Sequence, residues 1–380
     1  MAKRSSAIVL SPEAPWPVVG GGALRTASLI EYLRRRYDVT VVVFREPGAG
    51  PVPFPSDVNG SIIDLPRHSK AAPARIVRNL SRLLRGAPPL VDRFAGFPLP
   101  ETARFDIGVI EHFWCAPYVD ILRRRCDRLV LDLHNIESVL LSRQADLLPF
   151  AGRVAFRRFA AKCAELERAL LARFDTVLVT SEADRARIGT GVVYPNAVPD
   201  VPQPRPPKQN DIAFSGNMEY EPNYTAVRWF ATHVWPELRT RQPALNWRLI
   251  GRNEAAVRPL VSHDNHVILT GPVTDAVLEI ARARLAIVPV QAGSGTRIKI
   301  IEAWAAGVPV ISTTIGAEGL PATPGEHLLI ADTPADFLSA VERVLNDSAL
   351  QNRLASSGRR LYEQRLTWTA AWEALAAENI

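Results

Sequence analysis

Cysteine is rare in this sequence: the 380 residues include only Cys115, Cys126 and Cys163. These three form no C-x-x-C pair and no spacing with histidine that is typical of a metal site. The odd, scattered set excludes a disulfide framework and argues against a zinc site. We therefore expect no metal and no other cofactor, and a protein of a reducing compartment such as the cytosol.

Long hydrophobic runs are also missing. The longest β-branched run, residues 39–44, is far too short to cross a bilayer. Near the N-terminus, the apolar stretch 7–10 ends before it could serve as the hydrophobic part of a signal peptide, so a first buried strand is the better interpretation. We therefore expect no integral membrane segment and a cytoplasmic location.

Lysine is the third scarce residue, so arginine carries most of the basic charge. Five of the 45 basic residues are lysines, and the formal net charge is +6. Such an excess can indicate nucleic acid or an anionic membrane as a partner. The arginines are scattered without an aromatic-studded recognition motif, so we expect no nucleic-acid partner. With 47% hydrophobic residues, the chain is globular and not disordered.

Short apolar runs alternate with helical patterns along both halves of the chain. Those of the first half include SAIVLS, DVTVVVF, FDIGVIE, RLVLDLHN and DTVLVTS, and those of the second include DIAFSG, NWRLIGR, NHVILTG, LAIVPV and EHLLIAD. Strands that alternate with helices predict βαβ units and parallel sheets. The sequence therefore predicts an α/β protein of two Rossmann-like, doubly wound domains that face a cleft.

A proline-rich stretch, PNAVPDVPQPRPPK, separates the two series and can continue neither a helix nor a central strand. We predict an N-terminal domain over 1–198, a linker over 199–208, a C-terminal domain over 209–362, and a final helix within 363–380 that packs back across the junction. Open α/β sheets bind ligands at the carboxyl ends of their strands, so the ligand site is expected in the cleft.

The segment QAGSGTRIKIIE follows the apolar run LAIVPV and has features that favour an anion. Gly293 and Gly295 allow a sharp turn, and Ser294 or Thr296 can cap the helix that follows. The free amides and the dipole of a helix N-terminus attract anions. The sequence thus predicts a phosphate site at this turn.

Charged side chains follow on the same helix. Arg297 and Lys299 place two cations at its start, and Glu302 lies six residues after Thr296, roughly 9 Å along the axis. This spacing suits a nucleotide diphosphate at the tip, with the ribose hydroxyls donating to the carboxylate. The alternative is an ordinary capped helix with solvated cations, in which Glu302 pairs with Lys299.

Other candidates follow predicted strands of the first half. GGGALR, which begins at Gly20, does not fit the dinucleotide fingerprint, so its glycines form either a ligand-binding loop or a plain tight turn. His112 and His134 each stand just past a strand, where functional residues are common, although a lone histidine there is often structural. No Ser-His-Asp order or close carboxylate pair appears, which argues against hydrolysis by those routes.

The run AGSGTRIKIIEAWAAGVPVISTTIGAEGL resembles the donor-binding segment of glycosyltransferase family 4. The resemblance extends over most of the chain through GGGALR, HNIES, LVTSEAD, YPNAV, FSGNMEYEPN and LIGR. The family has the GT-B fold and transfers sugars with retention of configuration and without a required metal. The resemblance implies an acceptor-side N-terminal domain and a donor-nucleotide-binding C-terminal domain. It further implies transfer from a nucleotide-diphosphate sugar to a saccharide or lipid-linked acceptor, in polysaccharide or glycolipid assembly.

The resemblance and the charged helix start together predict roles for individual residues. His134, Arg297 and Lys299 would be catalytic, with His134 orienting the sugar, and His112 and Asn135 would contact the sugar or the acceptor. The residues expected to bind the donor are Gly21, Gly22, Gly216, Asn217, Arg252, Gly293, Ser294, Gly295, Thr296, Arg297, Lys299 and Glu302.

Two departures from the family pattern are visible. Many members carry a glutamate where this chain has Ser294, and that acid contacts the transferred sugar, so sugar identity cannot be carried over. Many also carry an arginine and a lysine on the loop after the first strand of the second domain, where GNMEYEPN has no cation. We therefore interpret Arg297 and Lys299 as relocated diphosphate ligands.

Two other functions fit the same residues. One is that of another GT-B enzyme, such as a sugar-nucleotide epimerase or a phosphorylase. The other is non-catalytic sugar binding by a two-lobed protein.

The stretch ARIVRNLSRLLRG, residues 74–86, predicts a basic amphipathic helix. Its arginines flank an apolar stripe formed by Ile76, Val77, Leu80, Leu83 and Leu84. From this pattern we hypothesise peripheral contact with the inner face of a membrane. The alternative is a surface helix whose apolar stripe packs on the sheet and whose arginines are solvated.

Overall fold

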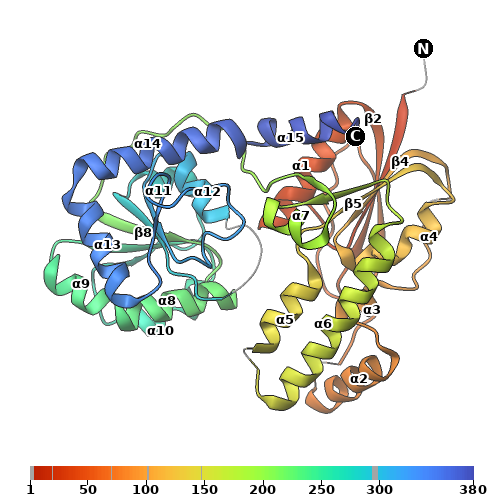
Figure 1. The fold of residues 1–380 in the computed structure, drawn as a ribbon, viewed down its shortest axis with the longest axis horizontal. Helices are drawn as coiled ribbons and strands as arrows, with labels where there is room; N and C mark the ends of the chain where they lie inside the picture. Colours follow the sequence, from red (N-terminus) through yellow and green to blue (C-terminus); the bar gives the residue numbers. More distant parts are fainter. Residues whose placement is uncertain (1–3, 19, 70, 101, 147, 293–297) are drawn as a thin grey trace. The chain divides into compact units, whose positions relative to one another are not determined.

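The computed structural model describes residues 4–18, 20–69, 71–100, 102–146, 148–292 and 298–380. The chain forms two compact units, one of Met1–Pro195 with Trp372–Ile380 and the other of Asn196–Ala371. Each unit has its own parallel sheet with helices packed around it (Figure 1). This confirms the predicted α/β fold of two Rossmann-like domains.

The N-terminal unit is built on a parallel sheet whose described strands follow the order β3-β2-β1-β4-β5-β6-β7. The strands are β1 (Ser5–Ser11), β2 (Tyr37–Arg45), β3 (Asn59–Asp64), β4 (Phe105–Glu111), β5 (Cys126–Asp132), β6 (Thr176–Val179) and β7 (Val192–Val193). The helices are α1 (Gly21–Arg34), α2 (Ala72–Arg85), α3 (Pro89–Phe94), the 3-10 helix η1 (Phe113–Tyr118), α4 (Val119–Leu122), α5 (Glu137–Asp146), α6 (Phe150–Leu171) and α7 (Glu182–Ile188). Residues 7–10 of β1 are completely buried, as expected for a strand covered on both faces.

The C-terminal unit has a second parallel sheet, with the described strands in the order β10-β9-β8-β11-β12-β13. The strands are β8 (Asp211–Ser215), β9 (Asn246–Ile250), β10 (Val267–Leu269), β11 (Leu285–Val288), β12 (Val310–Ser312) and β13 (Leu329–Ile330). The helices are α8 (Glu221–His233), α9 (Trp235–Arg241), the 3-10 helix η2 (Glu254–Ala256), α10 (Arg258–Val261), α11 (Ala276–Ala281), α12 (Ile298–Ala305), α13 (Pro334–Asn346) and α14 (Ser348–Arg365). Helix α15 (Trp368–Ala377) begins in this unit, and from Trp372 onward it belongs to the N-terminal unit.

Strand order reverses in both sheets next to the first strand of the unit. β1 lies between β2 and β4, and β8 lies between β9 and β11. Doubly wound sheets bind ligands at the carboxyl ends of the strands beside such a switch point. The loops that follow β1, β4 and β5 in one unit, and β8 and β9 in the other, are therefore expected to contain the ligand-binding residues.

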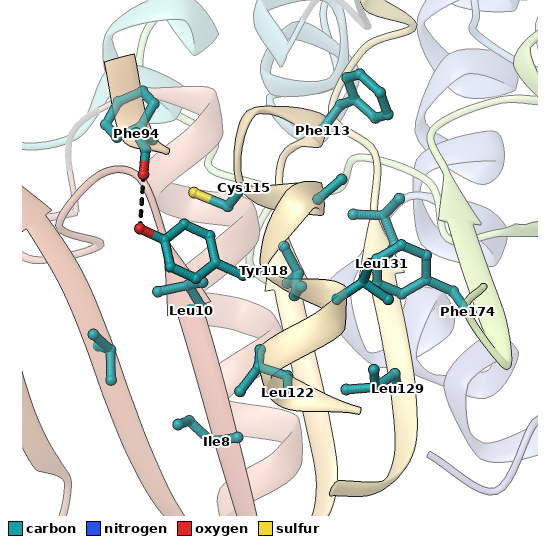
Figure 2. Packing of buried hydrophobic residues seen from close by; sticks show 14 of the residues in the cluster. Ile8, Leu10, Phe94, Phe113, Cys115, Tyr118, Leu122, Leu129, Leu131 and Phe174 are labelled. Carbon is teal, nitrogen blue, oxygen red and sulfur yellow. Dashed lines mark hydrogen bonds between the residues drawn. The ribbon is translucent and has the colours of Figure 1, made fainter. Parts of the chain in front are cut away.

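A buried hydrophobic cluster fixes η1 against the sheet of the N-terminal unit (Figure 2). Phe113, Cys115 and Tyr118 of η1 pack with strand residues that include Leu10 and Leu131. The Tyr118 hydroxyl donates to the Phe94 carbonyl at 2.8 Å, which ties α3 to the same cluster. This packing sets the position of His112, the residue that precedes η1.

The last residues of the chain belong to the N-terminal unit. The Trp372 indole donates to Ser28 Oγ at 3.0 Å, and the Arg35 guanidinium lies 4.0 Å from the centroid of the Trp372 ring. Arg128 Nη1 donates to the Glu378 carbonyl at 2.7 Å. The second half of α15 is thereby held against α1 and β5.

All three cysteines are unpaired and buried in the N-terminal unit. Burial raises the pKa of the Cys115 and Cys163 thiols, and it raises the pKa of Cys126 to about 11. The thiols are therefore protonated and chemically inert in the folded protein.

Candidate functional site

The sequence suggested that the glycines after β1 form a loop or a tight turn. In the structure these glycines lie at the start of a helix. Gly20 makes the turn with a φ of 94°, and α1 begins at Gly21. A Cβ added to Gly22 would lie 3.7 Å from His134 Nδ1 and 3.9 Å from His112 Nε2. Three predicted site residues, Gly22, His112 and His134, therefore meet at the carboxyl end of the sheet.

A network of buried charged and polar side chains holds the His134 ring in place. His134 Nε2 lies 2.7 Å from Glu111 Oε2, and Thr26 Oγ1 donates to the same oxygen at 3.1 Å. Arg25 donates to both carboxylate oxygens of Asp132, at 2.8 and 2.5 Å. Because α1, β4 and β5 each contribute to this network, the orientation of His134 is fixed by the core of the unit.

Burial dominates the electrostatics of this network. Desolvation, together with the charge of Asp132, raises the pKa of Glu111, while the interaction with His134 lowers it in part. Desolvation and the charges of His134 and Arg25 hold the pKa of His112 well below its usual range. His112 is therefore a neutral imidazole at physiological pH.

His112 has a backbone conformation that is rare for a residue with a side chain, with φ 61° and ψ 144°. Its amide donates to the Asp132 carbonyl at 2.9 Å, and its ring stacks on Trp114 and lies beside His134, with centroids 4.4 and 3.6 Å apart. Such strain persists only where the surroundings impose it, and it concentrates at functional sites. The strain favours a functional reading of His112 over a purely structural one.

Glu111, Asp132 and His134 also place potential metal ligands within 4.8 Å of one another. Arg25 already binds both oxygens of Asp132, and His134 lies on Glu111. Asp132 is therefore already paired with a cation of the chain, and Glu111 and His134 contact each other.

In the C-terminal unit, Lys299 of α12 reaches into the loop after β8. Its Nζ donates to Asn223 Oδ1 at 2.5 Å, and a Cβ added to Gly216 would lie 3.1 Å from this nitrogen. Asn223 Nδ2 in turn donates to the Asn217 carbonyl at 2.8 Å. A lysine from a later helix thus supplies a cation to a loop that has none of its own.

Glu302 follows Lys299 on α12 and lies beside the end of β8. Ser215 Oγ donates to Glu302 Oε2 at 3.4 Å. Burial raises the pKa of Glu302, and the nearby charge of Lys299 opposes that effect. The carboxylate is therefore positioned one turn from the cation, at the carboxyl end of β8.

The loops after β8 and β9 are in close contact. Gly251 has a φ of 131°, and a Cβ there would lie 2.1 Å from the Gly216 carbonyl oxygen, so only glycine fits. The Met218 amide donates to the Arg252 carbonyl at 3.0 Å, and Arg252 itself is exposed. Gly216 and Arg252, two predicted donor residues, are brought together by this contact.

The remaining predicted residues divide into two groups. Asn135 follows His134 and is half-buried. The others, Gly293, Ser294, Gly295, Thr296 and Arg297, lie outside the described residues.

Sequence reasoning missed the residues that support the site, namely Arg25, Thr26, Glu111, Asp132 and Asn223. One signal for them was present. Glu111 and Asp132 are acids at the ends of the otherwise apolar runs FDIGVIE and RLVLDLHN, and a charge that is carried into a buried strand requires a partner.

Both halves of the chain match models of known protein families. Residues 20–201 match the family described as glycosyl transferase 4-like domain, and residues 209–347 match the family described as glycosyl transferases group 1. Each half of the chain thus matches a family of glycosyltransferase domains.

Solved structures confirm the GT-B fold expected for such a pair. A sucrose-phosphate synthase from Thermosynechococcus elongatus is 17% identical, with 98% of each chain covered and a TM-score of 0.68. The Anabaena protein HepE, solved in complex with UDP and glucose, is 14% identical, with 99% of each chain covered and a TM-score of 0.65. At these identities the likeness shows the fold alone.

Curated relatives match over shorter stretches of the chain. An uncharacterized 44.6 kDa protein of the cps region of Klebsiella pneumoniae is 23% identical over 176 residues, which cover 43% of this chain and 45% of that protein. An exopolysaccharide phosphotransferase of Streptomyces coelicolor is 30% identical over 157 residues, which cover 35% of this chain and 16% of that protein. The chain thus spans less than half the length of these relatives.

Proposed function

We propose that the chain is a retaining, metal-independent glycosyltransferase that moves a sugar from a nucleotide-diphosphate donor to an acceptor hydroxyl, in polysaccharide or glycolipid assembly. The observation that carries the proposal is the position of Lys299. Its Nζ lies in the β8 loop beside Gly216 and Asn223, and Glu302 follows it on the same helix. A cation and a carboxylate so arranged match the two polar ends of a nucleoside diphosphate.

The donor roles follow from charge and distance. Lys299 binds the diphosphate and stabilises the negative charge that grows on it as the sugar leaves, because a fixed cation acts most strongly where charge develops. Glu302 accepts hydrogen bonds from the ribose hydroxyls. Arg297 adds a second diphosphate cation, and Gly216 lets the phosphates approach the backbone. That the HepE structure contains UDP supports a uridine nucleotide as the first donor to test.

The acceptor-side roles rest on the buried network under His134. Glu111 fixes the ring through Nε2, so Nδ1 faces Gly22 and can accept a hydrogen bond from a sugar hydroxyl. His112 and Asn135 extend this contact. The leaving phosphate takes the proton of the acceptor hydroxyl in a front-face displacement, so no separate protein base is required.

Peripheral membrane contact through residues 74–86 is part of the same proposal, on the cytoplasmic face. In the described part of the chain no helix has both the length and the apolar character that crossing a bilayer demands. On α2, however, Ile76, Val77, Leu80 and Leu84 point to solvent with exposed fractions of 55 to 82%. Most of the predicted apolar stripe is therefore exposed and Leu83 is half-buried, which supports membrane contact.

A screen of sugar nucleotides by thermal shift tests the proposal, because a bound donor stabilises the folded state by mass action. Product analysis with the labelled donor that binds then separates the functions. Transfer to an acceptor with the anomeric configuration retained, in the presence of a chelator, is the expected result. An isomerised nucleotide, a sugar phosphate, or binding without any product would each overturn it.

A further inference from the structure

The N-terminal unit contains a large hollow of about 1170 Å³. It is formed by the segments after β1, β2 and β3 together with α2, α3 and η1. Four arginines line it, Arg67, Arg78, Arg82 and Arg93. The volume exceeds that of a typical small-ligand pocket. The hollow can therefore hold a polar group of a ligand together with the adjoining part of the same ligand.

The charges of the hollow are unevenly compensated. Arg93 pairs with Glu46 at 2.6 Å, and Arg82 pairs with Asp92 at 2.8 Å. Within the described residues, Arg67 and Arg78 have no carboxylate partner, and the only recorded hydrogen bond of Arg78 goes to the Ser69 carbonyl at 3.1 Å. Two guanidinium groups therefore remain available to an anion.

His68, which lines the hollow, responds to this excess of positive charge. Burial and the charges of Arg93, Arg78 and Arg82 lower its pKa, although Glu46 opposes them. The groups that line the hollow thus produce a positive potential, and an anionic ligand would be drawn into it.

One wall of the hollow adjoins the proposed reaction site. Trp114 lines the hollow and stacks on His112, with ring centroids 4.4 Å apart. Glu13, a second lining residue, has Oε2 3.9 Å from the position of a Cβ at Gly22. A ligand held by the arginines can therefore extend along Trp114 toward His112 and Gly22.

We propose that the hollow binds a phosphate or diphosphate group of the acceptor, with Arg67 and Arg78 as its ligands. This inference rests on the proposed glycosyltransferase function and deepens it by naming the chemistry of the acceptor. Guanidinium groups suit phosphate because their planar N–H donors can bind two of its oxygens at once. The sugar hydroxyl that is to be glycosylated would then lie toward Gly22.

The first experiment uses inorganic pyrophosphate as the probe, measured by calorimetry. Pyrophosphate also fits the proposed donor site, so the titrations are made with the full chain carrying Arg297→Ala and Lys299→Ala together. Added Arg67→Ala or Arg78→Ala should weaken pyrophosphate binding at least tenfold. Arg104→Ala is the matched control, because Arg104 is exposed and pairs with Asp127 outside the hollow. Equal affinities for the Arg67→Ala and Arg104→Ala proteins would overturn the proposal.

Arg67 is exposed and makes no recorded bond within the described residues, so Arg67→Ala should fold normally even if Arg78→Ala does not. In the otherwise unchanged chain, Arg67→Ala should leave UDP affinity within twofold. Loss of UDP binding in that protein would show that the effect is not local to the hollow. Failure of the unchanged chain to bind any nucleotide would instead overturn the proposed function and leave the pyrophosphate result standing.

Two sources of the phosphate are separated by a second pair of probes. One is a water-soluble sugar phosphate, and the other is a vesicle of neutral lipid that contains a polyprenyl diphosphate. Binding of the soluble probe that Arg67→Ala abolishes identifies a soluble acceptor, whereas binding of only the loaded vesicle that Arg67→Ala abolishes identifies a lipid-linked one. If Arg67→Ala changes neither, the hollow is not the acceptor site.

Discussion

His134 makes two different contacts through its two ring nitrogens. Nε2 lies on the buried Glu111, and Nδ1 faces Gly22, where a Cβ would be 3.7 Å away. When Nε2–H donates a hydrogen bond to Glu111, Nδ1 is left as an acceptor, so the tautomer is set by a residue that touches no substrate. The functional nitrogen is thus the one that does not contact Glu111.

Replacing His134 with alanine should therefore lower turnover on the order of 10²-fold, while the affinity for a nucleoside diphosphate stays within twofold. Steady-state kinetics combined with calorimetry measures both. His233→Ala, an exposed histidine of α8, serves as the control. A loss of affinity without a loss of turnover would show that His134 is not the residue that orients the sugar.

A second buried acid, Glu137 at the start of α5, should control stability in a pH-dependent way. Burial raises its pKa from 4.5 to about 7, even though a helix start favours a negative charge. The folded state therefore binds this proton more tightly than the unfolded state. The associated stability is complete below pH 4.5 and is lost as the pH rises through 7.

Glu137→Gln should flatten this pH dependence and raise the free energy of unfolding at about pH 8 by up to about 3 kcal/mol. Urea unfolding between about pH 5 and 8 measures the slope. Glu165→Gln, at an exposed position of α6 paired with Lys162, should leave the slope in that range unchanged. An unaltered slope in the Glu137→Gln protein would mean that this carboxyl is ionised in the fold.

At the scale of elements, α12 and the β8 loop act together. Lys299→Ala should weaken nucleoside diphosphate binding by about 1.5 to 3 kcal/mol, the range of a charge-assisted hydrogen bond. The same loss is expected for Arg297→Ala. Glu302→Gln should weaken nucleotide binding much more than pyrophosphate binding, because only the nucleotide has a ribose. Equal losses for both ligands, measured by calorimetry, would contradict the ribose role.

The helix α2 has basic residues at the hollow and apolar residues exposed to solvent. Arg78 and Arg82 line the hollow, while the apolar residues Val77, Leu80 and Leu84 face solvent. Helix α6, which also contacts α2, has the exposed Phe150 as its first residue. Burial of such a face in a membrane interface is favourable in proportion to its apolar area, with basic residues attracting anionic lipid.

Sedimentation with liposomes should show binding that rises with anionic lipid content and falls with salt. Leu84→Asp combined with Val77→Asp should abolish it, and Arg75→Glu, which reverses an exposed charge outside the hollow, should weaken it. Leu278→Asp on α11 is the matched control, since Leu278 is also an exposed apolar residue but lies in the other unit. No co-sedimentation at low salt, or equal binding by both aspartate proteins, would reject membrane contact.

At the scale of the whole molecule, the two units have separate sheets and separate sequence ranges. A nucleoside diphosphate without its sugar should therefore slow hydrogen exchange chiefly in the C-terminal unit, near β8, β9 and α12. The complete sugar nucleotide should in addition protect the segment around His134. Protection by the nucleoside diphosphate that is strongest in the N-terminal unit would reverse the assignment of donor and acceptor sides.

The fold was largely predictable because buried parallel strands leave a strong local signal. All ten apolar runs named from the sequence are strands, and the missed strands β3, β7 and β12 are short or partly exposed. In the candidate site, the residues that follow strands, such as His112 and His134, and the charged pair Lys299 and Glu302 of α12 were predicted from local patterns. The pair Arg25 and Asp132 joins residues 107 positions apart, and such pairing leaves no mark on local sequence.

The three buried thiols can report when the N-terminal unit unfolds or opens. Because every cysteine lies in the N-terminal unit and is protonated there, an alkylating reagent should modify the chain only when that unit opens. The C-terminal unit has no cysteine, so the reagent does not label it. The rate of labelling therefore measures the opening of one lobe alone, in native buffer and without an engineered probe, whatever the other lobe has bound.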